Sequence, residues 1–164
     1  MVVVSLPPFQ RVVDDLGPAL RRHVAALVGV TDADDVVQET LISALGAYPG
    51  LPADANVRAW LWTIARNKAI DGHRRRGRRP QTTAWPDHDL PDRGTDGQTP
   101  ADTDEDLWAR VRALPDGQRL AVTLRFVDDL SYAQIGEHCG CSAAAARQRV
   151  YEGLQALRKE VMTP

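Results

Sequence analysis

The sequence has few cysteines, few aromatic residues and no long apolar segment. Its two cysteines, Cys139 and Cys141, are separated by one residue and cannot crosslink a secreted fold. Aromatic side chains make up 5% of the chain, which argues against a β-rich fold. No apolar run approaches the ~20 residues of a membrane-spanning helix, and the first residues lack the basic segment and cleavage site of a signal peptide. We therefore expect a cytoplasmic helical protein without direct membrane insertion.

The sequence also lacks the common signatures of an active site. No HxxxH pattern, glycine-rich phosphate loop or Ser/His/Asp arrangement is present. The scattered histidines are interpreted as solvated surface residues: His23, His73, His88 and His138. We expect no catalytic residue, no metal site and no cofactor. An enzyme, such as a metal-dependent nuclease, is the alternative that these absences count against.

Positive charge is scarce overall and unevenly distributed. The net charge is −2, which is unexpected for a protein that binds DNA by itself. Residues 1–80 carry 11 basic and 8 acidic side chains, residues 81–100 carry 1 and 4, and residues 101–164 carry 8 and 10. The positive charge is therefore concentrated in the first half of the chain, mainly between Arg74 and Arg79.

Residues 130–157 have the pattern of a helix-turn-helix. The pattern predicts a helix at 132–139, a turn containing Gly140 and a second helix that begins at Ser142. Gly140 suits the left-handed conformation that ends a helix, and Ser142 suits an N-cap. Gly136 has no side chain, so the second helix can pass close to the first.

The second of these helices has two stripes. One stripe is apolar and is predicted to be buried: Ala146, Val150, Leu154 and Leu157. The other is predicted to face outward: Ala144, Arg147, Gln148 and Tyr151. A short residue followed by Arg and Gln suits the major groove of DNA, where such side chains reach base edges. An ordinary amphipathic hairpin with a solvated arginine is the alternative from this stretch alone.

Two helices are predicted in the first 50 residues. Residues 9–28 have helical periodicity interrupted by Gly17-Pro18, which predicts two pieces or one kinked helix. Thr31 is predicted to cap a helix that runs to about Ala47. Its inward side is assigned to Val37, Leu41, Ala44 and Leu45, and another face to Asp35, Gln38, Glu39 and Ile42. This acidic face with an exposed isoleucine could dock a basic helical partner, whereas a solvated face is the alternative.

A further helix is predicted from Asn56, its N-cap, to about residue 76. Its inner stripe is assigned to Val57, Leu61, Ile64 and Ala65. Another face carries Arg58, Trp62 and Arg66, and the polar side continues through Asn67, Asp71, Arg74 and Arg75. Arginines interleaved with an outward tryptophan suit nucleic acid, because Arg binds phosphate and an aromatic ring stacks on an unpaired base. A core position suits Trp62 equally well.

The remaining pattern divides the chain into two parts. Residues 81–101 are rich in Pro, Gly, Thr and Asp, have no periodicity and are predicted to be a flexible acidic linker. Two helices follow, at 102–114 and 117–127, with Leu107, Val111 and Leu114 facing Leu120, Leu124 and Val127 in a small core. We expect an all-α fold of two small helical domains, at 1–79 and 102–164, joined by a flexible linker at 80–101, with the helix-turn-helix in the second.

Three segments, in this order, resemble extracytoplasmic-function sigma factors, the small two-domain specificity subunits of bacterial RNA polymerase. They are TDADDVVQETLISAL, VRAWLWTIARNKAIDGHRRR and LPDGQRLAVTLRFVDDLSYAQIGEHCGCSAAAARQRV. The resemblance implies transcription initiation at specific promoters. Its implied partners are RNA polymerase core enzyme, promoter DNA and an anti-sigma factor. It also implies that the acidic linker threads through the RNA exit channel.

The resemblance implies roles for residues at matching positions. Core-polymerase contacts would be Asp34, Asp35, Gln38 and Glu39. Contacts to the minus-ten promoter element would be Arg58, Trp62, Arg66, Asn67, Arg74 and Arg75. Contacts to the minus-thirty-five element would be Ser142, Ala144, Arg147, Gln148, Arg149 and Tyr151.

The sequence departs from the family pattern at two positions of the helix-turn-helix. Cys139 stands where a leucine is usual, which leaves a smaller side chain in the hairpin core. Glu152 stands where a basic residue is common, which removes a phosphate contact. A helix-turn-helix regulator that binds DNA alone remains the alternative function, although it does not account for the acidic face of the first domain.

Overall fold

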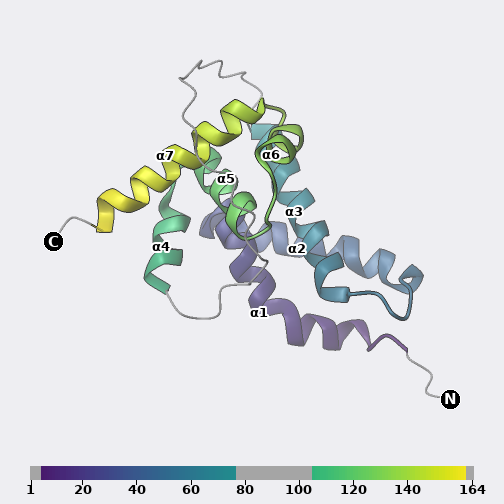
Figure 1. Cartoon of the computed structure of the whole chain (residues 1–164). Coiled ribbons are helices and arrows are strands. Elements are labelled where there is room, and N and C mark those ends of the chain that lie inside the picture. Colours follow the sequence, from purple (N-terminus) through teal and green to yellow (C-terminus); the bar gives the residue numbers. More distant parts are fainter. Residues whose placement is uncertain (1–4, 77–104, 162–164) are drawn as a thin grey trace.

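The computed structural model describes residues 5–76 and 105–161, and every regular element in these ranges is helical (Figure 1). The N-terminal domain contains α1 (Phe9–Val28), α2 (Val30–Ala47), the short 3-10 helix η1 (Tyr48–Gly50) and α3 (Val57–Arg76). The C-terminal domain contains α4 (Glu105–Ala113), α5 (Asp116–Phe126), α6 (Tyr132–Cys139) and α7 (Ala143–Val161). The all-α prediction is confirmed for these residues. The linker predicted at 80–101 lies outside them.

The first helix is continuous, and the second begins two residues earlier than the sequence predicted. Helix α1 runs through Pro18 without a break in its assignment. At its end Gly29 has a φ of 87°, a conformation that favours glycine, and α2 follows at once. Thr31 therefore lies inside the first turn of α2 and makes no capping hydrogen bond, so its predicted role as the N-cap is wrong.

Helix α2 buries a narrow stripe of small side chains. Ala33, Thr40 and Ala44 are buried, whereas Leu45 is 57% exposed and does not face inward as predicted. Leu45 follows Ala44 by one residue, so about 100° of helical rotation places it away from the core. Ile42 is 72% exposed, in agreement with its assignment to the outer face.

The N-cap predicted for α3 is confirmed. The Asn56 side chain accepts a hydrogen bond from the Ala59 backbone N–H at 3.0 Å. The buried side of α3 is formed by Leu61, Ala65, Ala69 and Ile70. Full burial of a leucine side chain stabilises a fold by about 1.5–3 kcal/mol, so Leu61 contributes substantially to the packing of α3 against α1 and α2.

Helix α5 is the central element of the C-terminal domain. It contacts α4, α6 and α7 of its own domain and also α1 of the other domain, so buried residues occur all around it. Val111, Leu114, Leu120 and Leu124 are buried as predicted, but Leu107 is 42% exposed, which corrects the inner stripe of α4. Leu107 lies in the first turn of α4, beyond the reach of the α5 core.

The helix-turn-helix forms at the predicted residues. Ser131 and Gln134 make a capping box at the start of α6, and Gly140 ends this helix in the left-handed conformation with a φ of 67°. The Ser142 hydroxyl accepts a hydrogen bond from the Ala145 backbone N–H at 3.0 Å and caps α7. Ala146 and Val150 of the predicted apolar stripe are fully buried.

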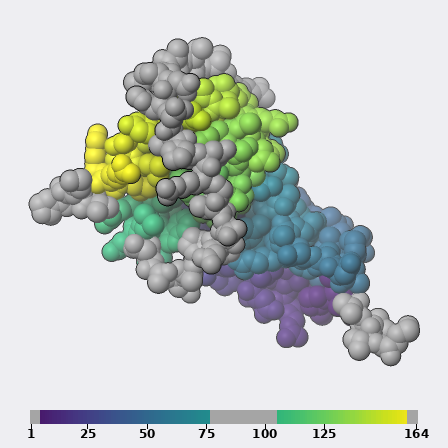
Figure 2. Space-filling view, viewed as in Figure 1, coloured from purple at the N-terminus to yellow at the C-terminus, as the bar shows by residue number. Residues whose placement is uncertain are grey.

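The two domains share one hydrophobic core. Leu20, Val24 and Leu27 of α1 belong to the same buried cluster as Leu120 and Leu124 of α5. Figure 1 shows the carboxyl half of α1 passing beside α5, and Figure 2 shows the two domains adjoining where grey atoms do not cover the boundary. No helix in the described ranges has the length and hydropathy required to cross a membrane.

Gly136 is expected to be intolerant of any side chain. A β-carbon placed there would lie 2.7 Å from the Cys141 carbonyl oxygen, which is backbone and cannot rotate away. We expect Gly136→Ala to lower the free energy of unfolding by about 2 kcal/mol, as overpacking does. Gly46→Ala is the control, because nothing lies within 4 Å of that position, and it should stabilise α2 by about 0.5–1 kcal/mol. Urea denaturation measures both, and equal stability of the two variants would contradict this account of the turn.

Candidate nucleic-acid and polymerase interfaces

The acidic face predicted on α2 is exposed. Asp34, Asp35, Gln38 and Glu39 all lie at the surface, and Ile42 lies one turn beyond Gln38. The face therefore combines exposed carboxylates with one exposed apolar side chain.

Asp34 differs from its neighbours on this face. Its carboxylate accepts a hydrogen bond from Arg21 of α1 at 2.8 Å. This hydrogen bond and the charge of Arg21 lower the pKa of Asp34 and raise that of Arg21. Asp34 is thus partly engaged within the domain, whereas Asp35 and Glu39 present their charges to solvent.

The aromatic face of α3 is organised around Trp62. The Arg58 guanidinium lies 4.5 Å from the centre of the Trp62 ring, and His23 of α1 stacks on Trp62 with ring centres 5.8 Å apart. Trp62 is half-buried as a result. The sequence left open whether Trp62 is a core residue or an exposed aromatic residue, and in the structure it is partly both.

The remaining basic residues of α3 extend from this face to the C-terminal domain. Asn67, Arg74 and Arg75 are exposed, and Arg66 is half-buried. Arg74 donates a hydrogen bond at 2.8 Å to the backbone carbonyl of Glu137 in α6. One predicted DNA contact of the first domain is therefore engaged with the second.

The predicted DNA-reading face of α7 is only partly exposed. Ser142 and Ala144 are exposed, whereas Arg147, Gln148, Arg149 and Tyr151 are half-buried. The stripe predicted to face outward is therefore only partly exposed at Arg147, Gln148 and Tyr151. The Arg147 guanidinium lies 5.4 Å from the centre of the Tyr132 ring, a cation–π contact that fixes its direction.

The two departures from the family pattern both have visible consequences. Glu152 accepts hydrogen bonds from Gln148 at 3.1 Å and from Gln118 at 3.3 Å. Gln148 is a predicted base contact, so Glu152 fixes the side-chain amide of that residue. Cys139 is half-buried in the hairpin, and burial raises the pKa of its thiol to about 11, so it remains protonated. Cys139 and Cys141 are both free thiols.

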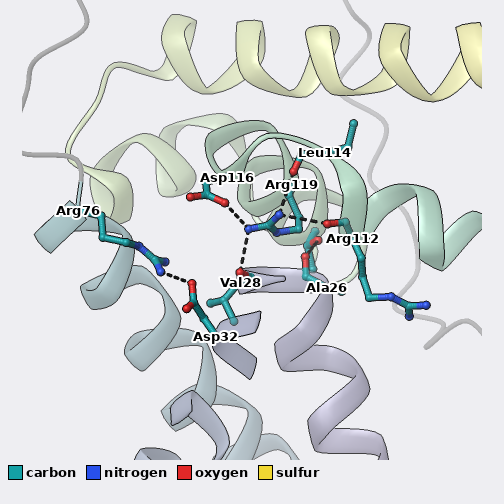
Figure 3. Close-up of polar contacts among 9 residues, drawn as sticks. Ala26, Val28, Asp32, Arg76, Arg112, Leu114, Asp116 and Arg119 are labelled. Atoms are coloured by element: carbon teal, nitrogen blue, oxygen red, sulfur yellow. Dashed lines mark hydrogen bonds and ion pairs between the residues drawn. The ribbon is translucent and has the colours of Figure 1, made fainter. Parts of the chain in front are cut away.

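Three polar residues at the domain boundary were missed by sequence reasoning. His23 is only 7% exposed and its Nε2 lies 3.4 Å from Asp128 Oδ1, so its interpretation as a solvated surface histidine is wrong. Arg119 is buried and donates to the Val28 carbonyl at the end of α1 (Figure 3). No local signal identifies these residues as joining the domains, because His23 pairs with Asp128 and Arg119 with Val28 across the boundary.

A fourth residue at the domain boundary, His73, lies among positive charges. A β-carbon placed on Gly117 would lie 3.9 Å from His73 Cε1 and 3.8 Å from Arg149 Cδ, so both side chains cover the start of α5. Burial lowers the pKa of His73, and the charges of Arg149, Arg76 and Arg119 lower it further, against an opposite effect of Asp116. In the described residues no three His, Cys, Asp or Glu side chains are grouped to hold a metal ion.

The lowered pKa of His73 predicts a pH dependence of stability. A histidine in the unfolded chain titrates near pH 6.5, and below that pH the unfolded state binds more protons at this position than the folded state. We expect the melting temperature to be unaffected by His73 above about pH 7 and to be reduced by it as the pH falls below about 6.5. His73→Gln should weaken this acid sensitivity, whereas His138→Gln should not. Identical pH profiles for wild type and His73→Gln would contradict the prediction.

Comparison with known proteins places this architecture in a family. The family model for sigma-70 region 2 matches residues 12–79, and that for sigma-70 region 4 matches residues 104–157. The ECF RNA polymerase sigma factor SigC of Mycobacterium tuberculosis is 38% identical over 141 residues, which cover 83% of this chain and 74% of that protein. The ECF RNA polymerase sigma factor EcfG of Rhodopseudomonas palustris is 35% identical over 134 residues, which cover 81% and 74%.

A solved structure of a sigma factor is also similar to this chain. The sigma factor RpoE from Bartonella quintana, in complex with the anti-sigma factor NepR, is 26% identical with a TM-score of 0.50. The alignment covers 92% of this chain and 94% of that one. The chain belongs to the extracytoplasmic-function sigma factors of RNA polymerase.

Proposed function

We propose that this sigma factor directs core RNA polymerase to its promoters through three surfaces on α2, α3 and α7. The observation that carries the proposal is their combination in one chain. An acidic apolar face, a basic aromatic face and a helix-turn-helix follow one another in the order of regions 2 and 4. We also propose the boundaries 1–79 and 102–164 for the two domains, with a linker at 80–101.

The α2 face is the proposed docking site for core enzyme. Its contacts would be Asp34, Asp35, Gln38 and Glu39, with Ile42 as the apolar centre. Asp35 and Glu39 have exposed carboxylates that can pair with basic side chains of a partner helix, and burial of Ile42 would add an apolar contribution. Asp34 would contribute less, because Arg21 already occupies its carboxylate.

The α3 face is the proposed minus-ten surface. Its contacts would be Arg58, Trp62, Arg66, Asn67, Arg74 and Arg75. Trp62 is held between Arg58 and His23, so the ring is fixed in direction before DNA arrives. A fixed aromatic ring beside arginines suits an unpaired base attached to a phosphate backbone.

The start of α7 is the proposed minus-thirty-five surface. Its contacts would be Ser142, Ala144, Arg147, Gln148, Arg149 and Tyr151. The small side chain of Ala144 leaves room for close approach to a groove. The Arg147 guanidinium lies over the Tyr132 ring. Arg in this position can make a bidentate contact to guanine.

The wider biology follows from these surfaces. The protein would act in the cytoplasm, where polymerase works, and its role would be binding rather than catalysis. An anti-sigma factor is the proposed inhibitor, because the solved relative RpoE is bound to one. The alternative, a stand-alone regulator, leaves the acidic face of α2 without a partner.

Charge reversal on α2 tests the docking site. Asp35→Arg with Glu39→Arg should abolish binding to core enzyme in a pull-down, because two attractive charges become repulsive. The free energy of unfolding should change by less than about 0.5 kcal/mol, since both residues are exposed. Asp14→Arg with Asp15→Arg on α1 makes the same charge change and should leave binding intact. Retained binding by the α2 variant would remove this assignment.

Replacement of Arg147 tests base reading. In run-off transcription with core enzyme, Arg147→Ala should cost about 1–3 kcal/mol at one base position of the upstream promoter element. Arg158→Ala, at the exposed far end of α7, is the control. A uniform loss over all promoter variants would indicate a phosphate contact instead. A gel shift with the chain alone separates the stand-alone regulator, which would bind duplex promoter DNA without polymerase.

A further inference from the structure

Glu152 connects α7, the proposed DNA-reading helix, to α5, which packs against it (Figure 1). Its Oε1 accepts a hydrogen bond from Gln148 Nε2, one turn earlier in α7, at 3.1 Å. Its Oε2 accepts a hydrogen bond from Gln118 Nε2 of α5 at 3.3 Å. Each carboxylate oxygen therefore bonds one side-chain amide, and the carboxylate is held from both helices.

The backbone beside Glu152 is fixed by close packing. A β-carbon placed on Gly153 would lie 2.6 Å from Val122 Cγ2 and 3.6 Å from Gln118 Cβ. Gly153 and Val122 are both buried, so α7 approaches α5 closely at the residue that follows Glu152. The half-buried Glu152 side chain thus extends from a firmly placed part of α7.

A carboxylate determines which way the Gln148 amide faces. A carboxylate only accepts hydrogen bonds, whereas a side-chain amide has an oxygen that accepts and a nitrogen that donates twice. Glu152 therefore requires the nitrogen of Gln148 to face it, as the 3.1 Å hydrogen bond shows. One N–H of a primary amide points away from its carbonyl oxygen, and the other lies on the same side as that oxygen. When the first bonds Glu152, the second remains beside the oxygen as one donor next to one acceptor.

Adenine is the base that complements this pair of groups in the major groove. Its N6 amino group donates and its N7 accepts, whereas guanine presents two acceptors, N7 and O6, so that the oxygen of Gln148 would face another acceptor. We propose that Glu152 is a positioning residue that restricts Gln148 to reading adenine in the minus-thirty-five element. The inference rests on the proposed function, in which Gln148 contacts this element, and adds the base that is read.

The same carboxylate has an opposite effect on overall affinity. Sequence-independent binding to DNA comes from basic side chains that neutralise phosphates, so a carboxylate near the duplex weakens it. Removal of Glu152 should therefore strengthen general binding while it relaxes the choice of base. A residue that only supported the fold of α7 would weaken both when replaced, and this difference separates positioning from a structural role.

Run-off transcription with core enzyme and the full-length chain tests the inference. The promoters carry each base in turn at each position of the minus-thirty-five element. At one position the wild type should favour adenine over guanine by about tenfold, as a bidentate base contact predicts, and Gln148→Ala should abolish this preference. Glu152→Ala should reduce it about fivefold, as the loss of one modest hydrogen bond predicts, and should raise transcription from promoters with other bases. An unchanged preference in Glu152→Ala would overturn the positioning role.

Base analogues test the contact itself in the wild-type chain, independently of any variant. At the preferred position, 7-deazaadenine removes the N7 acceptor, and 2-aminopurine removes the amino group that adenine carries as N6. Each analogue should lower transcription about fivefold, because each deletes one of the two hydrogen bonds. Neither should affect Gln148→Ala. Insensitivity of the wild type to either analogue would overturn the bidentate contact.

A matched variant controls for the loss of charge. Asp106→Ala removes an exposed carboxylate from α4 of the same domain and should leave the base preference unchanged. The double variant Gln148→Ala with Glu152→Ala should show the base preferences of Gln148→Ala, because effects that act through one residue are not additive. Circular dichroism checks that the variants keep their helices. An equal loss of preference in Asp106→Ala and Glu152→Ala would overturn the assignment to Glu152.

The wild-type chain also separates this inference from the proposed function. Transcription from the panel without an adenine preference at any position would overturn the reading of adenine and leave the sigma function standing. Absence of transcription from every promoter with core enzyme would overturn the proposed function and, with it, the inference.

Discussion

The fold depends on the junction at the end of α1, where one glycine and one buried arginine meet. Gly29 turns the chain directly from α1 into α2, and a β-carbon on it would lie 3.1 Å from the Arg119 guanidinium. The same arginine bonds the Val28 carbonyl one residue earlier. The Nη atoms of this buried guanidinium donate to carbonyls of both domains and to Asp116, so the end of α1 and the first turn of α5 are stabilised together.

Because the domains pack together at this junction, the surfaces proposed to contact polymerase and DNA are only partly exposed. Exposed groups such as Asp35, Glu39 and Ile42 lie on the side of α2 that the C-terminal domain does not cover. Residues nearer the boundary are engaged, as Arg74 is with Glu137. The face proposed to dock polymerase is thus exposed, whereas Arg74, a proposed DNA contact, is held in a hydrogen bond to the other domain.

Local features were predictable from sequence, and contacts between the domains were not. Ser142, Gly140 and Asn56 act within a few residues of their own positions, so turn and capping chemistry identified them. The spacing of apolar residues also predicted the helices. The prediction was wrong at Thr31, where Gly29 turns the chain into α2, and at Leu45 and Leu107, which lie near helix ends. The contacts of His23 with Asp128 and of Arg119 with Val28 could not be foreseen, because in each case the partner is far away in the sequence and lies in the other domain.

The separation in sequence across the junction has a consequence during synthesis. Val28 and Arg119 are 91 positions apart, and Ala26 and Thr123 are 97 apart. At roughly 5–20 residues per second, Val28 is synthesised roughly 5 to 18 seconds before Arg119. During that interval the carbonyls at the end of α1 lack their partners from α5, so the N-terminal helices exist without the other half of this junction.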